Sequence, residues 1–333
     1  MDFYPLTQKM IVRELSADSR ATVTELSKAA NCSRVTVTKQ LKNLEKSLGI
    51  KYTIEVDETK LGTTERHLIT VKFSKKPDTK LLKAFFAKEQ FAQQVYLTEG
   101  DFDLIIYARA GDPVSYIRWE TYISSELSEY GAVIRPSEFV LSHFGYFPLQ
   151  DDFVDDIKSI KLSEKDKKIL KLLNENSRMS FTEISKKAGL ERGTTRYRIF
   201  NLRKTGIIKR FTIAVQNPPK KYIAAYFVNY RFNKTTQERS AMARSSYMNA
   251  DEGVPLLTTY QILAPTSGSY RFFTMALFEN RQEALDRAIK EHARIFSKEN
   301  VEIKEARITE VIKGLLPFRN LDVKSNYTLI QWK

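Results

Sequence analysis

The stretch SRMSFTEISKKAGLERGTTRYRIFNLRK, residues 177–204, repeats an earlier part of the same chain. It aligns without a gap on SRATVTELSKAANCSRVTVTKQLKNLEK, residues 19–46. A strand-like run follows each copy, IKYTIEV (50–56) in the first and IKRFTIAV (208–215) in the second, with one residue inserted. Similarity at a fixed spacing indicates a duplicated unit, so we expect two tandem copies of one architecture.

The second copy carries the end signals of short helices. Ser180 and Glu183 form a capping-box pattern before a helix expected at 181–188. A third helix is expected at 192–204, followed by a strand pair at 207–215. Three helices and a β-wing in this order predict a winged helix-turn-helix.

The third helix has two unlike faces. Positions 195, 199 and 202 share one face at helical spacing and are expected to pack inward. The equivalent inward set of the first copy is Val37, Leu41 and Leu44. The outward face is basic, which is typical of a helix that enters the major groove of DNA. The predicted DNA-binding residues are Arg192, Thr194, Arg196, Tyr197, Arg198, Arg203, Lys204, Lys209 and Arg210 in the second copy, and Arg34, Thr36, Thr38, Lys39 and Lys42 in the first.

Within the second copy, two pairs of basic residues have different expected roles. Arg196 and Arg198 lie on the third helix and are expected to contact base edges or phosphates. Lys209 and Arg210 lie on the expected wing, where phosphate contacts are the predicted role.

Positive charge is concentrated in one part of the chain. The 333 residues carry a net charge of +14, and residues 161–221 alone hold 17 basic and 5 acidic side chains. Residues 1–66 are nearly balanced, with 11 basic and 9 acidic side chains. A concentrated basic surface attracts a polyanion, either nucleic acid or an anionic membrane. Because the apolar faces of these helices are needed for their own core, double-stranded DNA is the predicted partner and no membrane contact is expected.

The same strand and helix order follows each helix-turn-helix. A βαββαβ pattern predicts a ferredoxin-like sandwich in both halves, and the fold class is therefore α+β. In the first half the expected elements are 67–73, 79–88, 91–98, 102–109, 114–127 and 132–144. In the second half they are 222–232, 237–248, 255–263, 270–278, 282–296 and 301–312.

These patterns divide the chain into five parts. They are a first module at 1–62, a first sandwich at 63–149, an acidic linker at 150–160, a second module at 161–218 and a second sandwich at 219–333. Exposed sheet faces need covering. The sandwiches are therefore expected to pair with each other or with those of a second chain, giving a homodimer or higher homo-oligomer.

The helical modules resemble the Lrp/AsnC family of transcription regulators. The resemblance rests on LSEKDKKILKLLNENSRMSFTEISKKAGL and TTRYRIFNLRKTGIIKRFTIAV in the second module, and on LTEGDFDLIIYA (97–108) in the first sandwich. It implies a cytoplasmic, nucleoid-associated regulator that dimerises through its sandwich sheets and binds amino acids at the sandwich interfaces. Two units in one chain depart from the usual single unit and suggest a built-in, asymmetric pseudo-dimer.

The resemblance implies an effector site at the turn between the central strands of the first sandwich. Its residues are Thr98, Gly100, Asp101 and Asp103. The alternative is a purely structural role, in which both aspartates only form a turn. The second copy reads GSYR (268–271) instead of GDFD. Arg271 is expected either to attract a ligand carboxylate or to pair with one of these aspartates and close the site.

An enzyme on the same layout is the alternative function. Siroheme decarboxylases share this architecture and can occur as fused two-unit chains. They carry a His/Tyr-rich stretch around the central strands, whereas QVYLTEGDFDLIIYA and TYQILAPTSGSYRFFTMA contain no histidine. No catalytic set, metal site or cofactor is expected, because the chain has one cysteine and three widely separated histidines. The absence of a long apolar run and of a signal-peptide core predicts a soluble, intracellular protein.

Overall fold

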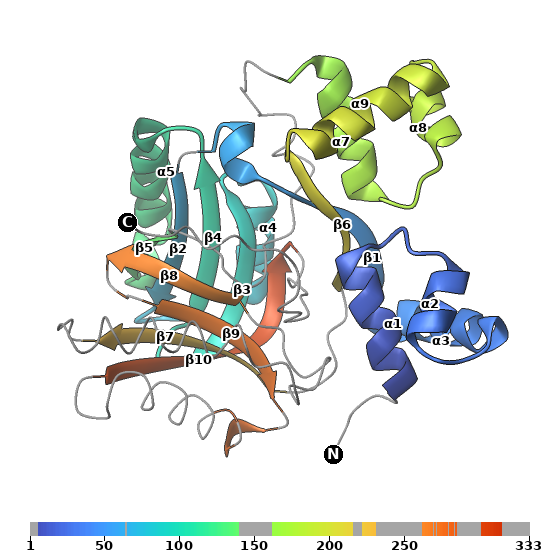
Figure 1. Cartoon of the computed structure of the whole chain (residues 1–333). Coiled ribbons are helices and arrows are strands. Elements are labelled where there is room, and N and C mark those ends of the chain that lie inside the picture. The colour runs from blue at the N-terminus through green and yellow to red at the C-terminus, as the bar shows by residue number, and fades with distance from the viewer. Residues whose placement is uncertain are drawn as a thin grey trace, which may run out of the picture.

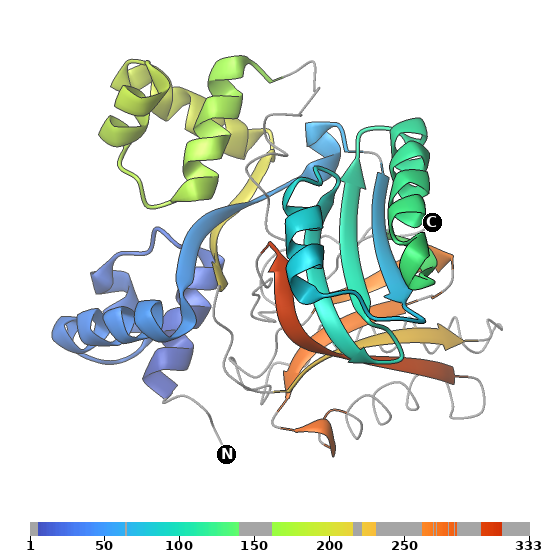
Figure 2. The same ribbon diagram turned by 180° about the vertical axis from the view of Figure 1, so that it is seen from behind.

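The computed structural model describes residues 6–63, 65–139, 162–215, 222–230, 262–268, 270, 272–278, 280–282, 284 and 301–314. Two three-helix modules lie one above the other on the same side of a strand barrel (Figure 1). The reverse view shows a pair of strands running between the modules, with helices on the outside of the barrel (Figure 2). The molecule therefore has a helical part and a sheet part, joined by this pair of strands.

Each module has three helices and one strand. The first contains α1 (Leu6–Ala17), α2 (Val23–Ala29), α3 (Arg34–Leu48) and β1 (Ile50–Val56). The second contains α7 (Glu164–Glu175), α8 (Phe181–Ala188), α9 (Arg192–Lys204) and β6 (Ile208–Val215). The predicted bounds of α8 and α9 are confirmed, as is the capping box of Ser180 and Glu183. The two predicted inward faces are buried as well.

The strand pair predicted at 207–215 is wrong, because the structure has a single strand there. Its partner is β1 of the first module, which runs antiparallel to it with Thr53 opposite Thr212. Ile213 of β6 is buried in the core of the first module, and Ile54 of β1 is buried in the core of the second. We call β1 and β6 together the ribbon. Each module is thus completed by the strand of the other.

Two arginines at equivalent repeat positions connect the modules beside the ribbon. Arg20 Nε donates to the carbonyl of Ser177 at 2.6 Å, and Arg178 Nε donates to the carbonyl of Ser19 at 2.6 Å. Each guanidinium makes a second bond, at 3.2 Å, to the carbonyl two residues further on. The hydroxyls of Ser19 and Ser177 lie 2.6 Å apart. These reciprocal contacts show that the modules are related by a pseudo-twofold axis.

The two sandwiches have the predicted strand order. The first comprises β2 (Glu65–Lys72), α4 (Thr79–Ala87), β3 (Ala92–Gly100), β4 (Leu104–Ala110), α5 (Pro113–Glu126) and β5 (Val133–Phe139), with short 3-10 helices η1 (Glu58–Leu61) and η2 (Ser128–Tyr130). The second comprises β7 (Tyr222–Tyr230), β8 (Ile262–Gly268), β9 (Phe272–Phe278) and β10 (Val301–Lys313). The helix predicted at 237–248 lies outside the described residues, as do most of the helix at 282–296 and most of the strand at 255–263.

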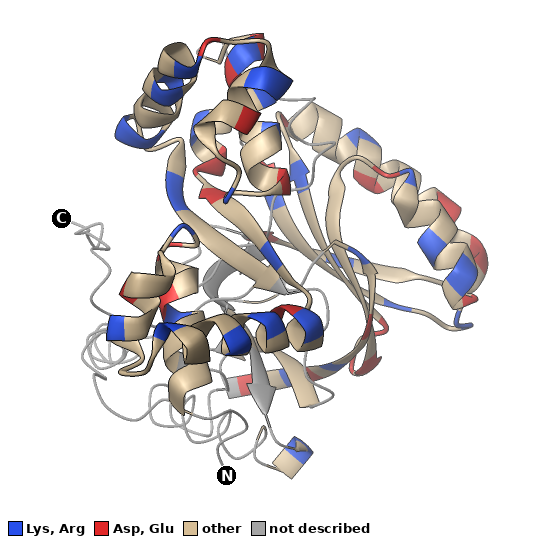
Figure 3. Cartoon of the chain, turned by 90° about the vertical axis from the view of Figure 1, so that its right-hand side faces the viewer, with Lys and Arg blue, Asp and Glu red and all other residues tan. Residues whose placement is uncertain are grey.

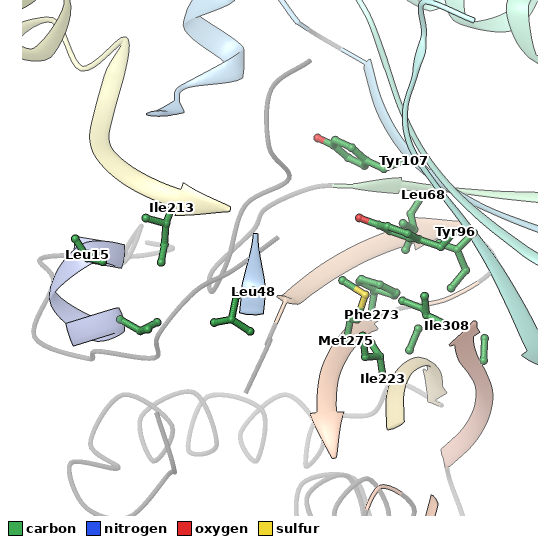
Figure 4. Close-up of a cluster of buried hydrophobic side chains, with 14 of the residues drawn as sticks. Leu15, Leu48, Leu68, Tyr96, Tyr107, Ile213, Ile223, Phe273, Met275 and Ile308 are labelled. Carbon is green, nitrogen blue, oxygen red and sulfur yellow. The ribbon is translucent and has the colours of Figure 1, made fainter. Parts of the chain in front are cut away.

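The two sheets join into one closed barrel in the order β10-β3-β4-β2-β5-β8-β9-β7. The second strand of each sandwich pairs with the fourth strand of the other, as β3 with β10 and β5 with β8. Within this barrel, Leu68 and Tyr96 lie near Phe273 and Met275, while Ile213 lies apart, beside Leu15 (Figure 4). Pairing of the sandwiches is therefore satisfied inside one chain, and closure leaves these sheets no free edge.

Removing one arginine of the reciprocal pair tests the connection between the modules. Arg178→Ala leaves the carbonyls of Ser19 and Ala21 without their donor and removes the guanidinium from its place 4.2 Å from the Tyr52 ring centroid. We expect the free energy of unfolding of the helical modules to fall by about 3 kcal/mol, measured by urea denaturation. Arg192→Ala, an exposed arginine on α9, is the control and should change it by less than about 0.5 kcal/mol. Equal effects of the two substitutions would show that Arg178 does not connect the two modules.

Candidate nucleic-acid interface

The recognition helix α9 is held to its own module by one narrow face. Thr195, Ile199 and Leu202 are buried, and the Thr195 hydroxyl donates to the Glu191 carbonyl at 3.0 Å. Ile199 and Leu202 pack in the cluster that also contains Ile184 of α8. This seam fixes the rotation of the helix, so the exposed side chains of α9 point away from the module.

The outward face of α9 combines cations with two aromatic rings. Tyr197 and Phe200 are 64% and 62% exposed, which is unusual for side chains of this size. Of the predicted residues, those exposed on the helix and wing are Arg192, Thr194, Arg196, Tyr197, Arg203, Lys204 and Lys209. Lys and Arg, drawn in blue, recur along the helices of both modules (Figure 3). Together the cations form a surface that can neutralise phosphate, with an apolar centre.

Two of the predicted arginines face acidic partners within the protein. Arg198 Nη1 lies 2.9 Å from Asp166 and 3.1 Å from the hydroxyl of Ser163, at the beginning of α7. Arg210 pairs with Glu55, the residue opposite it in the ribbon. Both side chains hold elements of the fold together. Their roles toward DNA stay predictions, and the structure adds a reason for their presence that does not involve DNA.

The first module exposes a different set of side chains on α3. Arg34, Thr38, Lys39 and Lys42 are exposed, as predicted for a DNA-facing helix. Thr36 is half-buried, and its backbone N–H donates to the cap residue Ser33 at 3.1 Å. The helix α3 thus exposes as many cations as α9, but it also exposes the acidic Glu45 where α9 has Arg203.

A buried polar cluster joins the second module to the first sandwich. Glu58 of η1 accepts bonds from Arg109 at 2.7 Å and from the Tyr107 hydroxyl at 2.8 Å. Burial raises the pKa of Tyr107, which keeps the hydroxyl protonated as a donor. Lys60, on the same turn, donates to the carbonyl of Thr205 at the end of α9, at 2.7 Å. Sequence reasoning missed this cluster. Its one signal is Arg109 within an otherwise apolar strand.

The predicted effector turn lies where the two sandwiches meet. Asp101 accepts a bond from the backbone N–H of Glu305 in β10 at 2.7 Å. Gly100 adopts φ +119°, and a Cβ there would lie 2.6 Å from the Glu305 carbonyl oxygen, so the approach of β10 requires glycine. Thr98 is buried and its hydroxyl donates to the carbonyl of Phe102 at 2.9 Å.

Asp103 is turned into its own sandwich instead. Its carboxylate accepts a bond from the Phe73 N–H at 2.9 Å and lies 3.1 Å from Lys76 and 3.3 Å from Lys72. Burial raises the pKa of Asp103, but the Phe73 bond and the two lysines outweigh burial and hold it below its usual 3.8. Arg271 lies outside the described residues. The effector role of this turn stays a prediction.

In the part of the chain that the structure describes, neither a metal site nor a membrane-spanning helix is formed. Within that part, three or more His, Cys, Asp or Glu side chains do not gather in an arrangement suited to a metal ion. Cys32 is a free, half-buried thiol. Among the same residues, none of the helices has the length and apolar character needed to cross a bilayer.

The helical modules match a known family. The winged helix-turn-helix DNA-binding model matches residues 6–47 and 162–209. The HTH-type transcriptional regulator FL11 of Pyrococcus horikoshii is 34% identical over 87 residues, which cover 26% of this chain and 58% of that protein. LrpA of the same organism is 42% identical over 59 residues, covering 18% and 41%. Both modules are winged helix-turn-helices, and over them the chain is similar to FL11 and LrpA, in line with the resemblance to Lrp/AsnC regulators.

The matches to these relatives are partial, whereas a solved structure matches the whole layout. The chain spans about 39% to 58% of the length of the first relatives it matches. The siroheme decarboxylase NirDL superposes with a TM-score of 0.57, covering 93% of both chains at 14% sequence identity. At that identity the likeness establishes a shared fold and no shared chemistry.

Substitution of Arg196 and substitution of Arg198 are expected to have different effects, the first on DNA binding and the second on stability. Arg196→Ala is expected to weaken DNA binding about tenfold and to leave the melting temperature unchanged, because the side chain is exposed. Arg198→Ala is expected to lower the free energy of unfolding by about 1 kcal/mol, because Asp166 loses its partner. Fluorescence anisotropy and thermal melting measure the two effects. Arg118→Ala, an exposed arginine on α5, is the control for loss of charge alone. A loss of binding for Arg118→Ala equal to that for Arg196→Ala would contradict the placement.

The environment of Asp103 predicts a pH dependence. Because its folded pKa lies below the unfolded value, the carboxylate stabilises the protein above pH 4, and this stabilisation is lost as pH falls through the folded pKa. Asp103→Asn should therefore destabilise the protein at pH 7, and the difference from the wild type should shrink below about pH 4. Urea denaturation at several pH values measures this. A difference that stays constant from pH 7 to pH 3 would show that charge plays no part.

Proposed function

We propose that this chain is a transcription regulator that binds double-stranded DNA through its paired winged modules and acts at the nucleoid. The observation that carries the proposal is the outward face of α9, which presents four exposed arginines and lysines from a helix whose opposite face is fixed in the core. A helix of this kind fits the major groove, and the ribbon sets a second one beside it. The regulator names of the relatives support the same assignment.

Binding should depend mainly on the second module. Residues 161–221 hold most of the excess positive charge of the chain, and phosphate neutralisation dominates affinity for DNA. The first module contributes fewer cations, and Glu45 stands where the second module has Arg203. The first module therefore binds DNA more weakly than the second. Because both modules bind the same duplex, the first still raises the overall affinity of the chain through its proximity.

Sensing and assembly complete the proposal. An amino acid or related small molecule is proposed to bind at the seam near Asp101, where the two sandwiches meet. Association of two chains through their sandwich domains, into a homodimer or higher homo-oligomer with four DNA-binding modules, is proposed to use surfaces other than the sheet edges, which the barrel closes within one chain. Of the two aspartates, Asp101 suits an ammonium group better, because its one lysine, Lys304, lies 3.9 Å away, whereas two lysines lie within 3.3 Å of Asp103.

The enzyme alternative rests on the fold of NirDL alone. Among the described residues the one histidine is His67, which stacks on Tyr116 of α5 with ring centroids 3.5 Å apart and so faces the outer helix layer. The described side chains of the hydrophobic cluster inside the barrel include Tyr96, Tyr107 and Phe273, and Arg109 is buried beside Tyr107. They supply no imidazole for a tetrapyrrole iron; His143 and His292 lie outside the described residues.

DNA binding by the intact chain should be strongly salt-dependent. If six to ten phosphates are contacted, affinity should fall by roughly 10³–10⁵ between 50 and 200 mM salt. Anisotropy of a labelled duplex measures this, and addition of siroheme with absorbance detection tests the alternative in parallel. A flat salt response would contradict the proposal. A shifted siroheme spectrum without DNA binding would favour the enzyme.

Effector binding should appear as thermal stabilisation. A ligand at a hundredfold excess over its Kd stabilises the folded protein by about 2.7 kcal/mol, which shifts the melting temperature measurably. The twenty amino acids are tested singly, and Asp101→Asn should abolish the shift produced by the true effector. No shift with any amino acid, or a shift that survives this substitution, would leave the turn as structure only.

A further inference from the structure

The two recognition helices occupy symmetry-related positions. Thr53 and Thr212, equivalent in the repeat, lie opposite each other in the ribbon, and Ser19 and Ser177 meet beside it. The pseudo-twofold axis defined by these pairs relates α3 to α9. Regulators with two identical heads bind pseudo-palindromic DNA, because the operator mirrors the twofold symmetry of the protein.

The ends of the two helices present the same cations. Arg34 and Arg192 are exposed at the first position of α3 and α9, and Lys46 and Lys204 are exposed in the last turn. Identical charges at symmetric places can contact equivalent phosphates on either side of the axis. Both heads therefore have the means to hold the same duplex in the same orientation relative to its grooves.

The centres of the two helices differ at three outward positions that can reach a base, while Thr36 and Thr194, and Asn43 and Asn201, are identical pairs. The pairs that differ are Thr38 and Arg196, Lys39 and Tyr197, and Lys42 and Phe200. All six side chains are exposed, so the difference lies on the surface and not in the core. Phosphate contacts carry no sequence information, whereas these central positions do.

Tyr197 and Phe200 need an apolar partner that the module does not provide. The core-facing side of α9 is filled by other residues, and both rings lie among cations on the open side. In the major groove the apolar group available to them is the C5-methyl of thymine. Arg196, beside them, fits the two acceptors of guanine. The lysines at the equivalent positions of α3 offer no such apolar contact, and the exposed apolar residue of α3, Val35, lies at its start, where α9 has Gly193.

We propose that this chain reads a non-palindromic duplex with two unlike half-sites about one helical turn apart, of which the α9 half-site contains thymines contacted by Tyr197 and Phe200. This inference rests on the proposed DNA-binding function and adds the class of DNA sequence recognised. Because the heads are fused, each molecule binds its site in one orientation. A regulator of this kind distinguishes the two sides of its operator without a second protein.

Selection from a random duplex library by the intact chain tests the inference. The expected motif has two different half-sites, one of them containing thymine and guanine. A palindromic motif would overturn the inference and leave the DNA-binding function intact. No enrichment of duplex DNA at all, by contrast, would overturn the proposed function itself.

A variant that makes α9 resemble α3 provides the matched comparison. The triple substitution Arg196→Thr, Tyr197→Lys and Phe200→Lys changes exposed positions only, and an unchanged melting temperature confirms folding. The selected motif should become an inverted repeat of the α3 half-site. An unchanged motif would overturn the role of the three side chains.

Uracil substitution tests the methyl contact in the wild-type chain, independently of any variant. Replacing thymine by uracil in the α9 half-site should weaken binding about fourfold per methyl group lost. The same replacement in the α3 half-site should leave affinity within twofold. Equal effects in both half-sites, or none in either, would overturn the assignment of Tyr197 and Phe200.

Discussion

The exchange of strands in the ribbon is the constraint on which the rest of the structure depends. A three-helix module with one strand leaves an unpaired strand edge and an uncovered apolar side chain. Pairing β1 with β6 satisfies both modules at once, because Ile54 and Ile213 each fill the core of the other module. The arginine bonds of Arg20 and Arg178 then fix the modules around the pseudo-twofold axis. The positions of α3 and α9 relative to each other follow from these contacts.

In the barrel, as in the ribbon, strands from the two halves of the chain pair with each other. Pairing β3 with β10 and β5 with β8 removes the free edges of both sheets within one chain. The turn at Asp101 is part of one of these seams, and Glu58 links the first sandwich to the turn that contacts the end of α9. Because the two units are covalently fused, the paired sheets, the candidate ligand site at their seam and both DNA-binding modules all belong to one chain.

The sequence predicted local structure well and long-range pairing poorly. The α8 and α9 bounds were readable because capping and helical periodicity are local signals, as the Ser180 and Glu183 box shows. The strand that pairs with β6 could not be predicted, because the antiparallel ladder joins segments from different copies of the repeat. No short-range sequence pattern encodes which strand is the partner. Counting charges predicted that Arg198 and Arg210 bind DNA, and it could not show the acidic side chains that also face them in the folded protein. The repeated Ser-Arg pairs were visible as similarity, but their reciprocal bonds required the folded arrangement.

The most direct test is whether the ribbon forms within one chain. Glu55 and Arg210 lie opposite each other with their side chains in contact. Glu55→Cys with Arg210→Cys, in a Cys32→Ser background, should on mild oxidation give a disulfide within single chains, seen as a monomer of altered mobility on a non-reducing gel. A covalent dimer as the main product would show that the strands pair between chains, and it would contradict the account.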